Sequence, residues 1–133
     1  MRSKKEIVIE FEYIENQITQ ASDQLDKFDT QHAKLRSAID AVTKLSNNTE
    51  ALVPISEGVY TCATITQTDS VIIDIGADVA VRKTREQAVH ILESQLHIVE
   101  SYQDKLTQRL QKLSQRADEL QAELRELEPQ KTA

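Results

Sequence analysis

The sequence predicts an α+β fold: a long antiparallel two-helix coiled coil with a central pair of β-hairpins that form an intersubunit β-barrel. Apolar residues recur at steps of three and four near both ends, and β-branched residues crowd the middle of the chain. The composition is also unusual, with two Gly, two Pro and no Trp in 133 residues. Such a bias suits long helices better than a compact globule. The expected segments are residues 1–50, 51–83 and 84–133.

The first segment carries one unbroken apolar seam. Its spacing repeats every seven residues, which stays on one face of a helix only when two helices wind around each other. A lone helix with this stripe exposed to water would not be stable, so a partner helix is required. The seam positions are Ile7, Phe11, Ile14, Ile18, Ala21, Leu25, Phe28, His32, Leu35, Ile39 and Val42.

The last segment repeats the pattern and supplies that partner. Thr84 followed by Gln87 forms a capping-box pair, so the helix is expected to begin at Arg85, and Pro129 marks its end. The seam positions are Val89, Leu92, Leu96, Val99, Gln103, Leu106, Leu110, Leu113, Ala117, Leu120, Leu124 and Leu127.

The middle segment reads as four short strands in two hairpins, over about 52–55, 59–66, 71–75 and 79–83. Turn residues around Gly58 and Gly76 separate the strands, and Pro54 places the first strand at an edge. Because the hairpins reverse the chain, the two helices should pair antiparallel. Aligning their ends nearest the hairpins sets Ile39 opposite Leu92 and Phe11 opposite Leu120.

Two polar residues interrupt the seam in this register. His32 and Gln103 are expected within about one helical turn of each other. His32 has three readings: a residue that sets the register of the coil, a pH switch, or a partly solvated position with no role.

Hairpins of this size cannot bury both faces or pair all their edges alone, so the sequence predicts assembly through the strands. Pairing with other chains would close the strands into a barrel. The residues expected to carry subunit contacts are Val59, Thr61, Ala63, Ile65, Val71, Ile73, Ile75, Val79 and Val81.

Several functions are disfavoured. The net charge of −6 is evenly spread, and without a basic patch or an Arg/Lys stripe nucleic-acid binding is not expected. The single Cys62 cannot form an intrachain disulfide, which fits a reducing cytoplasm, and no signal peptide or membrane span is expected. We expect no enzyme, cofactor or metal: the chain has no glycine-rich phosphate loop or catalytic grouping, and His90 and His97 lack a third ligand.

The central residues resemble the signature of the prefoldin α class. The matching positions are Leu52-Val53-Pro54-Ile55, Gly58, Tyr60, Ala63, Ile65, the run Val71-Ile72-Ile73-Asp74-Ile75-Gly76, Val79, Val81 and Lys83. The resemblance extends over essentially the whole chain. It implies a heterohexamer of two α and four β subunits, with six coiled coils hanging from a β-barrel platform. It also implies that unfolded clients are held between the coil tips and passed to a group II chaperonin without nucleotide.

Client contact is expected where the coil ends, because apolar groups are free only where the helices splay. The expected residues are Ile7, Val8, Ile9, Phe11, Leu120, Leu124 and Leu127. Ile7, Val8, Ile9 and Phe11 could equally be coil core plus a frayed end. Two other functions remain open: a coiled-coil scaffold or adaptor that oligomerises through its hairpins, and a helical arm that binds nucleic acid.

Overall fold

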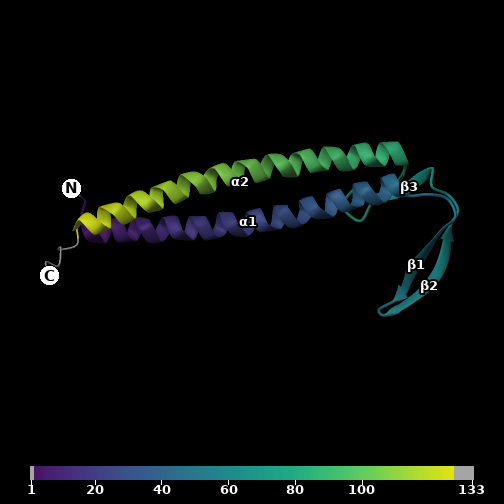
Figure 1. Cartoon of the computed structure of the whole chain (residues 1–133), viewed down its shortest axis with the longest axis horizontal. Helices are drawn as coiled ribbons and strands as arrows, with labels where there is room; N and C mark the ends of the chain where they lie inside the picture. Colours follow the sequence, from purple (N-terminus) through teal and green to yellow (C-terminus); the bar gives the residue numbers. More distant parts are fainter. Residues whose placement is uncertain (1, 128–133) are drawn as a thin grey trace. The chain divides into compact units, whose positions relative to one another are not determined.

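The computed structural model describes residues 2–127 and contains the predicted succession of elements (Figure 1). The elements are α1 (Lys4–Lys44), β1 (Thr49–Ser56), β2 (Val59–Ile65), β3 (Ser70–Asp74), β4 (Ala80–Thr84) and α2 (Arg85–Leu127). Pro129, the predicted end of the second helix, lies outside the described residues. The chain divides into two compact units, residues 2–32 with 99–127 and residues 33–98. We describe each unit by itself.

Both helices begin at side-chain caps. The Ser3 hydroxyl accepts a hydrogen bond from the Glu6 amide at 3.2 Å. At the start of α2, the Thr84 amide donates to Gln87 Oε1 and the Gln87 amide donates to Thr84 Oγ1, each at 3.1 Å. This reciprocal pair is a capping box, which satisfies amides that have no partner within the helix. The predicted start at Arg85 is therefore confirmed.

The first unit is an antiparallel pair of helices whose core follows the predicted seam. Contacts between the helices run in opposite directions: Asp29 meets Gln103, Gln17 meets Arg109 and Glu10 meets Arg116. Ile7, Ile14 and Leu120 form the buried cluster, against which five partly buried seam residues pack. These five are Phe11, Ile18, Leu113, Ala117 and Leu124. Both sets come from the predicted positions.

Gln103, the polar residue in the seam of α2, forms a hydrogen bond with α1. Gln103 Nε2 donates to Asp29 Oδ1 at 2.7 Å, and Asp29 lies three residues before His32 on α1. Gln103 thus lies within one helical turn of His32, as expected, but its hydrogen-bond partner is the carboxylate. His32 and Gln103 are both partly buried.

Replacing His32 and Gln103 together with Leu should raise the melting temperature. Removing two polar groups from partly buried seam positions should raise the free energy of unfolding by about 1 kcal/mol, after the loss of the hydrogen bond to Asp29 is subtracted. Thermal unfolding followed by circular dichroism would measure the change. Gln20→Leu with Gln111→Leu, at exposed positions outside the seam, is the matched control. A lower melting temperature in the His32/Gln103 variant would show that the bond to Asp29 outweighs seam polarity.

The second unit contains both hairpins. β1 pairs antiparallel with β2, with Ala51 opposite Ala63, and β3 pairs with β4, with Ile73 opposite Val81. The first strand begins at Thr49, earlier than predicted, because Thr49 pairs with Ile65 at the base of the hairpin. Gly58 closes the first turn with a φ of 80°, which glycine adopts without strain.

Candidate functional site

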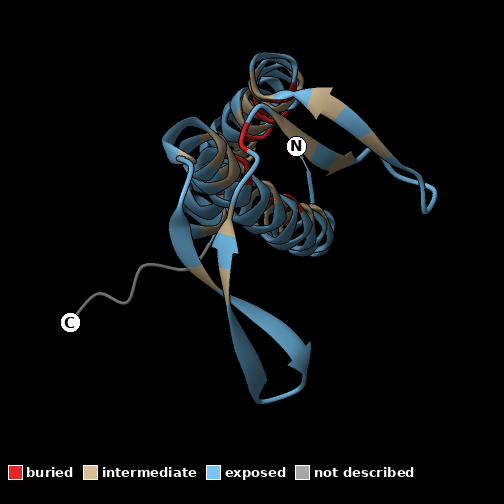
Figure 2. Cartoon of the chain, turned by 90° about the vertical axis from the view of Figure 1, so that its right-hand side faces the viewer, coloured by how far each residue is buried: buried red, intermediate tan, exposed pale blue. Residues whose placement is uncertain are grey.

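Most residues of the first hairpin are exposed, as Figure 2 shows, and they include large apolar residues on both faces. Cross-strand partners point to the same face, so Leu52 shares a face with Cys62, and Val53 shares the other with Thr61. Leu52 is 67% exposed, and Val53 and Tyr60 are also exposed. Because each hairpin forms its own two-stranded sheet, each strand keeps one unpaired edge. Within residues 2–127, large apolar side chains on both faces of this hairpin are exposed, and its two outer strand edges pair with no other strand.

The predicted assembly residues lie in both hairpins and differ in their exposure. Val59, Thr61, Ile75 and Val79 are exposed, whereas Ala63, Ile65, Val71, Ile73 and Val81 are partly buried. The prediction missed Leu52, Ile55, Tyr60 and Ile72, which are more exposed than most of the residues it named. Their signal was present in the sequence: β1, the start of β2 and β3 are apolar at successive positions, as in a strand that is buried on both faces.

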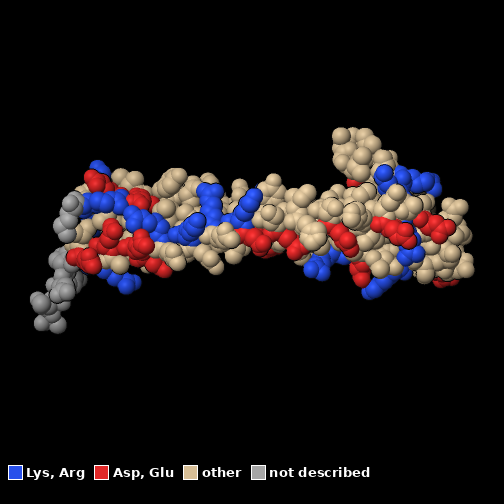
Figure 3. Space-filling model, turned by 90° about the horizontal axis from the view of Figure 1, so that it is seen from above, with Lys and Arg blue, Asp and Glu red and all other residues tan. Residues whose placement is uncertain are grey.

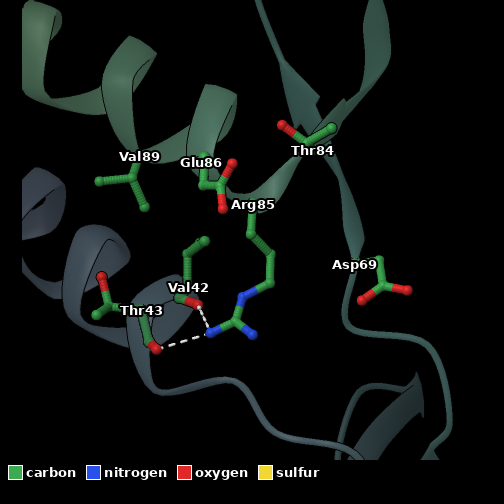
Figure 4. A pocket seen from close by; sticks show the side chains of 7 residues that line it. All are labelled: Val42, Thr43, Asp69, Thr84, Arg85, Glu86 and Val89. Atoms are coloured by element: carbon green, nitrogen blue, oxygen red, sulfur yellow. Dashed lines mark hydrogen bonds between the residues drawn. The ribbon is translucent and has the colours of Figure 1, made fainter.

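A polar junction holds the base of the hairpins to α1. Arg85 Nη2 donates to the carbonyl oxygens of Val42 at 3.2 Å and Thr43 at 2.8 Å, as Figure 4 shows. These carbonyls belong to the last turn of α1, where a cation also interacts favourably with the helix dipole. The Arg85 amide donates to the Asp69 carbonyl at 3.2 Å. One residue therefore ties the end of α1, the link between the hairpins and the start of α2.

Thr68 completes the junction. It is the buried polar residue of the described chain, and its hydroxyl donates to Asn47 Oδ1 at 2.8 Å. The bond joins the link between the hairpins to the turn before β1. Sequence reasoning missed both Arg85 and Thr68, because neither contact follows from spacing along a helix or strand.

The coil tip, defined as residues 2–12 with 118–127, holds the predicted client-contact residues. Ile7 is 2% exposed and Leu120 is fully buried, so both belong to the helix–helix core. Val8, Phe11 and Leu124 are partly buried, and Leu127 is exposed. Ile9 is 58% exposed. In the closed coil, Ile9 and Leu127 are the most accessible of the seven, and the core residues become accessible only where the helices part.

Ion pairs surround this apolar core. Glu10 pairs with Arg2 and, at 2.9 Å, with Arg116, which also pairs with Glu119 at 3.0 Å. Hydrogen bonds from Arg2 and Arg116 hold the pKa of Glu10 below its ordinary value. Bonds to Glu119 and Glu10 raise the pKa of Arg116. The network joins the start of α1 to α2 across the tip.

Acid should weaken this network. A carboxylate with a lowered folded-state pKa stabilises the fold above its unfolded pKa, and the contribution is lost as the pH falls through the folded value. The difference in melting temperature between the native chain and Glu10→Gln should therefore be largest near neutral pH and should shrink below about pH 4. Glu12→Gln, two residues farther along α1 and exposed, is the control. A difference that stays constant with pH would contradict the assignment.

A row of cations lies along one flank of α2. Lys105, Arg109, Lys112 and Arg116 follow at steps of four, three and four, which places them on one face of this continuous helix. Figure 3 shows Lys and Arg gathered in a band on one face of the helical part, beside Asp and Glu. The prediction that the chain lacks an Arg/Lys stripe is wrong, because net charge and segment totals do not show how a helix sorts charges by face.

The described residues give no sign of two other kinds of site. Over residues 2–127, neither helix contains a stretch long and apolar enough to cross a membrane. Within the same range, His, Cys, Asp and Glu side chains form no group of three or more that could hold a metal ion.

Comparison with known proteins identifies the family. The family model described as "Prefoldin subunit" matches residues 14–130. The chain belongs to the prefoldin family. Among its curated relatives, Prefoldin subunit alpha of Methanothrix thermoacetophila is 34% identical over 62 residues, covering 47% of this chain and 40% of that protein. Prefoldin subunit alpha of Thermoplasma acidophilum is 26% identical over 91 residues, covering 67% of this chain and 70% of that protein.

These relatives confirm the resemblance to the prefoldin α class. The match to the Methanothrix protein spans less than half of either chain. A chain in the cryo-EM structure of filamentous PFD from Methanocaldococcus jannaschii superposes with a TM-score of 0.70 at 19% identity, covering 85% of this chain and 96% of that one. At that identity the likeness shows the fold, which is two long helices joined through two small hairpins, as predicted.

Proposed function

We propose that this chain is the α subunit of a prefoldin-type chaperone that captures unfolded proteins without nucleotide and without enzymatic chemistry. The observation that carries the proposal is the family match over residues 14–130. The structure supports it with two separate apolar features: uncovered hairpins in one unit and a coil tip bearing Ile9 and Leu127 in the other. One feature is suited to assembly and the other to weak client contacts.

Assembly would use the hairpins. Strand edges left unpaired and large apolar side chains left exposed favour association with further strands. We propose closure into a β-barrel with β-class prefoldin subunits, giving a heterohexamer of two α and four β subunits. The predicted residues Val59 to Val81 would then be joined at the contacts by Leu52, Tyr60 and Ile72.

Client holding would rest on many weak contacts. Each exposed apolar side chain at the tip offers little area at about 25 cal/mol per Å². Several arms that engage one unfolded chain convert these weak contacts into useful affinity through effective concentration. Such binding acts on the unfolded state by mass action, so it needs no ATP. We further propose cytoplasmic location and transfer of the client to a group II chaperonin.

A scaffold or adaptor is the competing function, because exposed hairpins would serve it equally well. The experiment that separates the two is aggregation of a chemically unfolded client, followed by light scattering, with the chain co-expressed with a β-class partner. The proposal expects suppression of scattering without nucleotide and no change when ATP is added. Full aggregation in the presence of excess assembled complex would favour the scaffold.

A further inference from the structure

A groove in the first unit combines an aromatic floor with uncompensated cations. It has a volume of about 580 Å³ and lies between Lys27 and Phe28 of α1 and Tyr102, Lys105 and Arg109 of α2. The Phe28 and Tyr102 rings stack with centroids 5.2 Å apart and planes 7° apart. Tyr102 is 49% exposed although it packs on the seam. The groove therefore offers apolar aromatic surface to the solvent.

The cations around this floor have no anionic partner in the part of the chain that the structure describes. Lys27 and Lys105 make no ion pair with a carboxylate of residues 2–127, and Lys105 Nζ lies 5.7 Å from the centre of the Tyr102 ring. Arg109 donates to Gln17 Oε1 at 2.6 Å, a neutral amide.

Arg116, farther along the same flank of α2, has a different kind of partner on α1 from that of Arg109. Arg116 occupies the position seven residues after Arg109, and its partner on α1 is the carboxylate of Glu10 rather than an amide. The equivalent position opposite Arg109 is Gln17. The coil thus neutralises Arg116, whereas Lys27, Lys105 and Arg109 around the groove have no ion-pair partner within residues 2–127.

We propose that this groove binds short acidic polypeptide segments that also carry an aromatic or large aliphatic side chain. The carboxylates would meet Lys27, Lys105 and Arg109, and the apolar side chain would lie on the Phe28–Tyr102 floor. Cations beside an aromatic ring favour this combination over either feature alone. The proposal stands on the groove itself and does not depend on client binding at the coil tip.

Charge decides against nucleic acid as the occupant. A phosphate backbone is held by a long track of free cations. Here the row on α2 ends at Arg116, which Glu10 and Glu119 already neutralise. A short acidic segment needs only the cations that line the groove, Lys27, Lys105 and Arg109. A long polyanion would extend past them over a chain whose net charge is −6 and would be repelled there.

Fluorescence anisotropy of labelled peptides on the assembled complex tests the proposal. The probes are a short Glu/Tyr peptide, a Glu/Ser peptide, a Lys/Tyr peptide and an oligothymidylate matched in charge to the first. We expect the Glu/Tyr peptide to bind tightest and its affinity to fall as salt is added. Equal or tighter binding of the oligothymidylate, or of the Lys/Tyr peptide, would overturn the assignment.

Variants locate the binding. Lys27→Gln with Lys105→Gln should weaken the Glu/Tyr peptide on the order of tenfold, since two exposed charges are lost. Lys34→Gln with Lys44→Gln, exposed lysines in the second unit, should leave its affinity unchanged. Tyr102→Ala should weaken binding and Tyr102→Phe should preserve it, with helix content checked by circular dichroism. Equal affinities in the groove and control lysine variants would place the peptide elsewhere and refute the proposal.

Discussion

Removing the coil tip should abolish or strongly weaken client holding while sparing assembly. The variant lacks residues 1–10 and 124–133, of which 1 and 128–133 lie outside the described residues. It loses Ile9 and Leu127, the most accessible apolar side chains among the seven predicted client residues, and leaves both hairpins intact. Holding by several arms falls steeply when each weak contact is lost. Light scattering of an aggregating client measures the effect, beside a size measurement of the complex.

A variant with two substitutions separates the loss of client contact from the loss of coiled-coil stability. The truncation also removes Ile7 and Glu10, which stabilise the helix pair. Ile9→Gln with Leu127→Gln changes exposed side chains only and should weaken holding in the same direction at unchanged melting temperature. Tyr13→Gln, exposed on the turn after the tip, is the control. Full client protection by both the truncated and the doubly substituted complex would move the binding site to the platform or along the helices.

Placing charge on the exposed hairpin faces should prevent assembly without unfolding the chain. Leu52 is 67% exposed and Ile72 is 66% exposed, so Leu52→Glu with Ile72→Glu has little effect on the isolated fold. If partner strands cover these faces, two carboxylates are buried at a cost of several kcal/mol, enough to dissociate the complex. Native mass measurement should find two copies of the unsubstituted chain in a discrete complex and none of the variant.

The same account predicts how the chain behaves alone. Without its partner, the native chain should self-associate or be poorly soluble, and the Leu52/Ile72 variant should be more soluble. Gln20→Glu with Gln111→Glu, which adds the same charge to exposed helix positions, should change neither assembly nor solubility. A native chain that stays monomeric at micromolar concentration, with its hairpins protected from hydrogen exchange, would argue against assembly through the strands.

The elements that depend on local pattern were predictable from sequence. The seam of Ile7, Ile14 and Leu120 follows from heptad spacing, and the start of α2 follows from the Thr84–Gln87 pair. Both are properties of one helix or of two helices that share a repeat. The antiparallel pairing followed because the hairpins between the helices reverse the chain.

Side-chain contacts between residues that are distant in the sequence were not predictable. Arg85 reaches carbonyl groups of Val42 and Thr43, which are remote in sequence, and nothing in its neighbours indicates that contact. Gln103 was expected near His32, but its hydrogen bond is to Asp29. The flexible Gln side chain can reach several residues within one turn of the facing helix, so the sequence does not determine which of them it binds. The groove at Phe28 and Tyr102 likewise forms only when the two helices align.

Photo-crosslinking from defined positions tests the central claim most directly. A photoreactive amino acid would replace Ile9 at the coil tip, Gln20 farther along α1, or Tyr60 on the hairpin, each an exposed position, in the assembled complex. After mixing with an unfolded client, the account predicts strong client adducts from position 9, few from position 20, and only subunit adducts from position 60. Client adducts concentrated at position 60, with none at position 9, would contradict the claim that the tip holds the client.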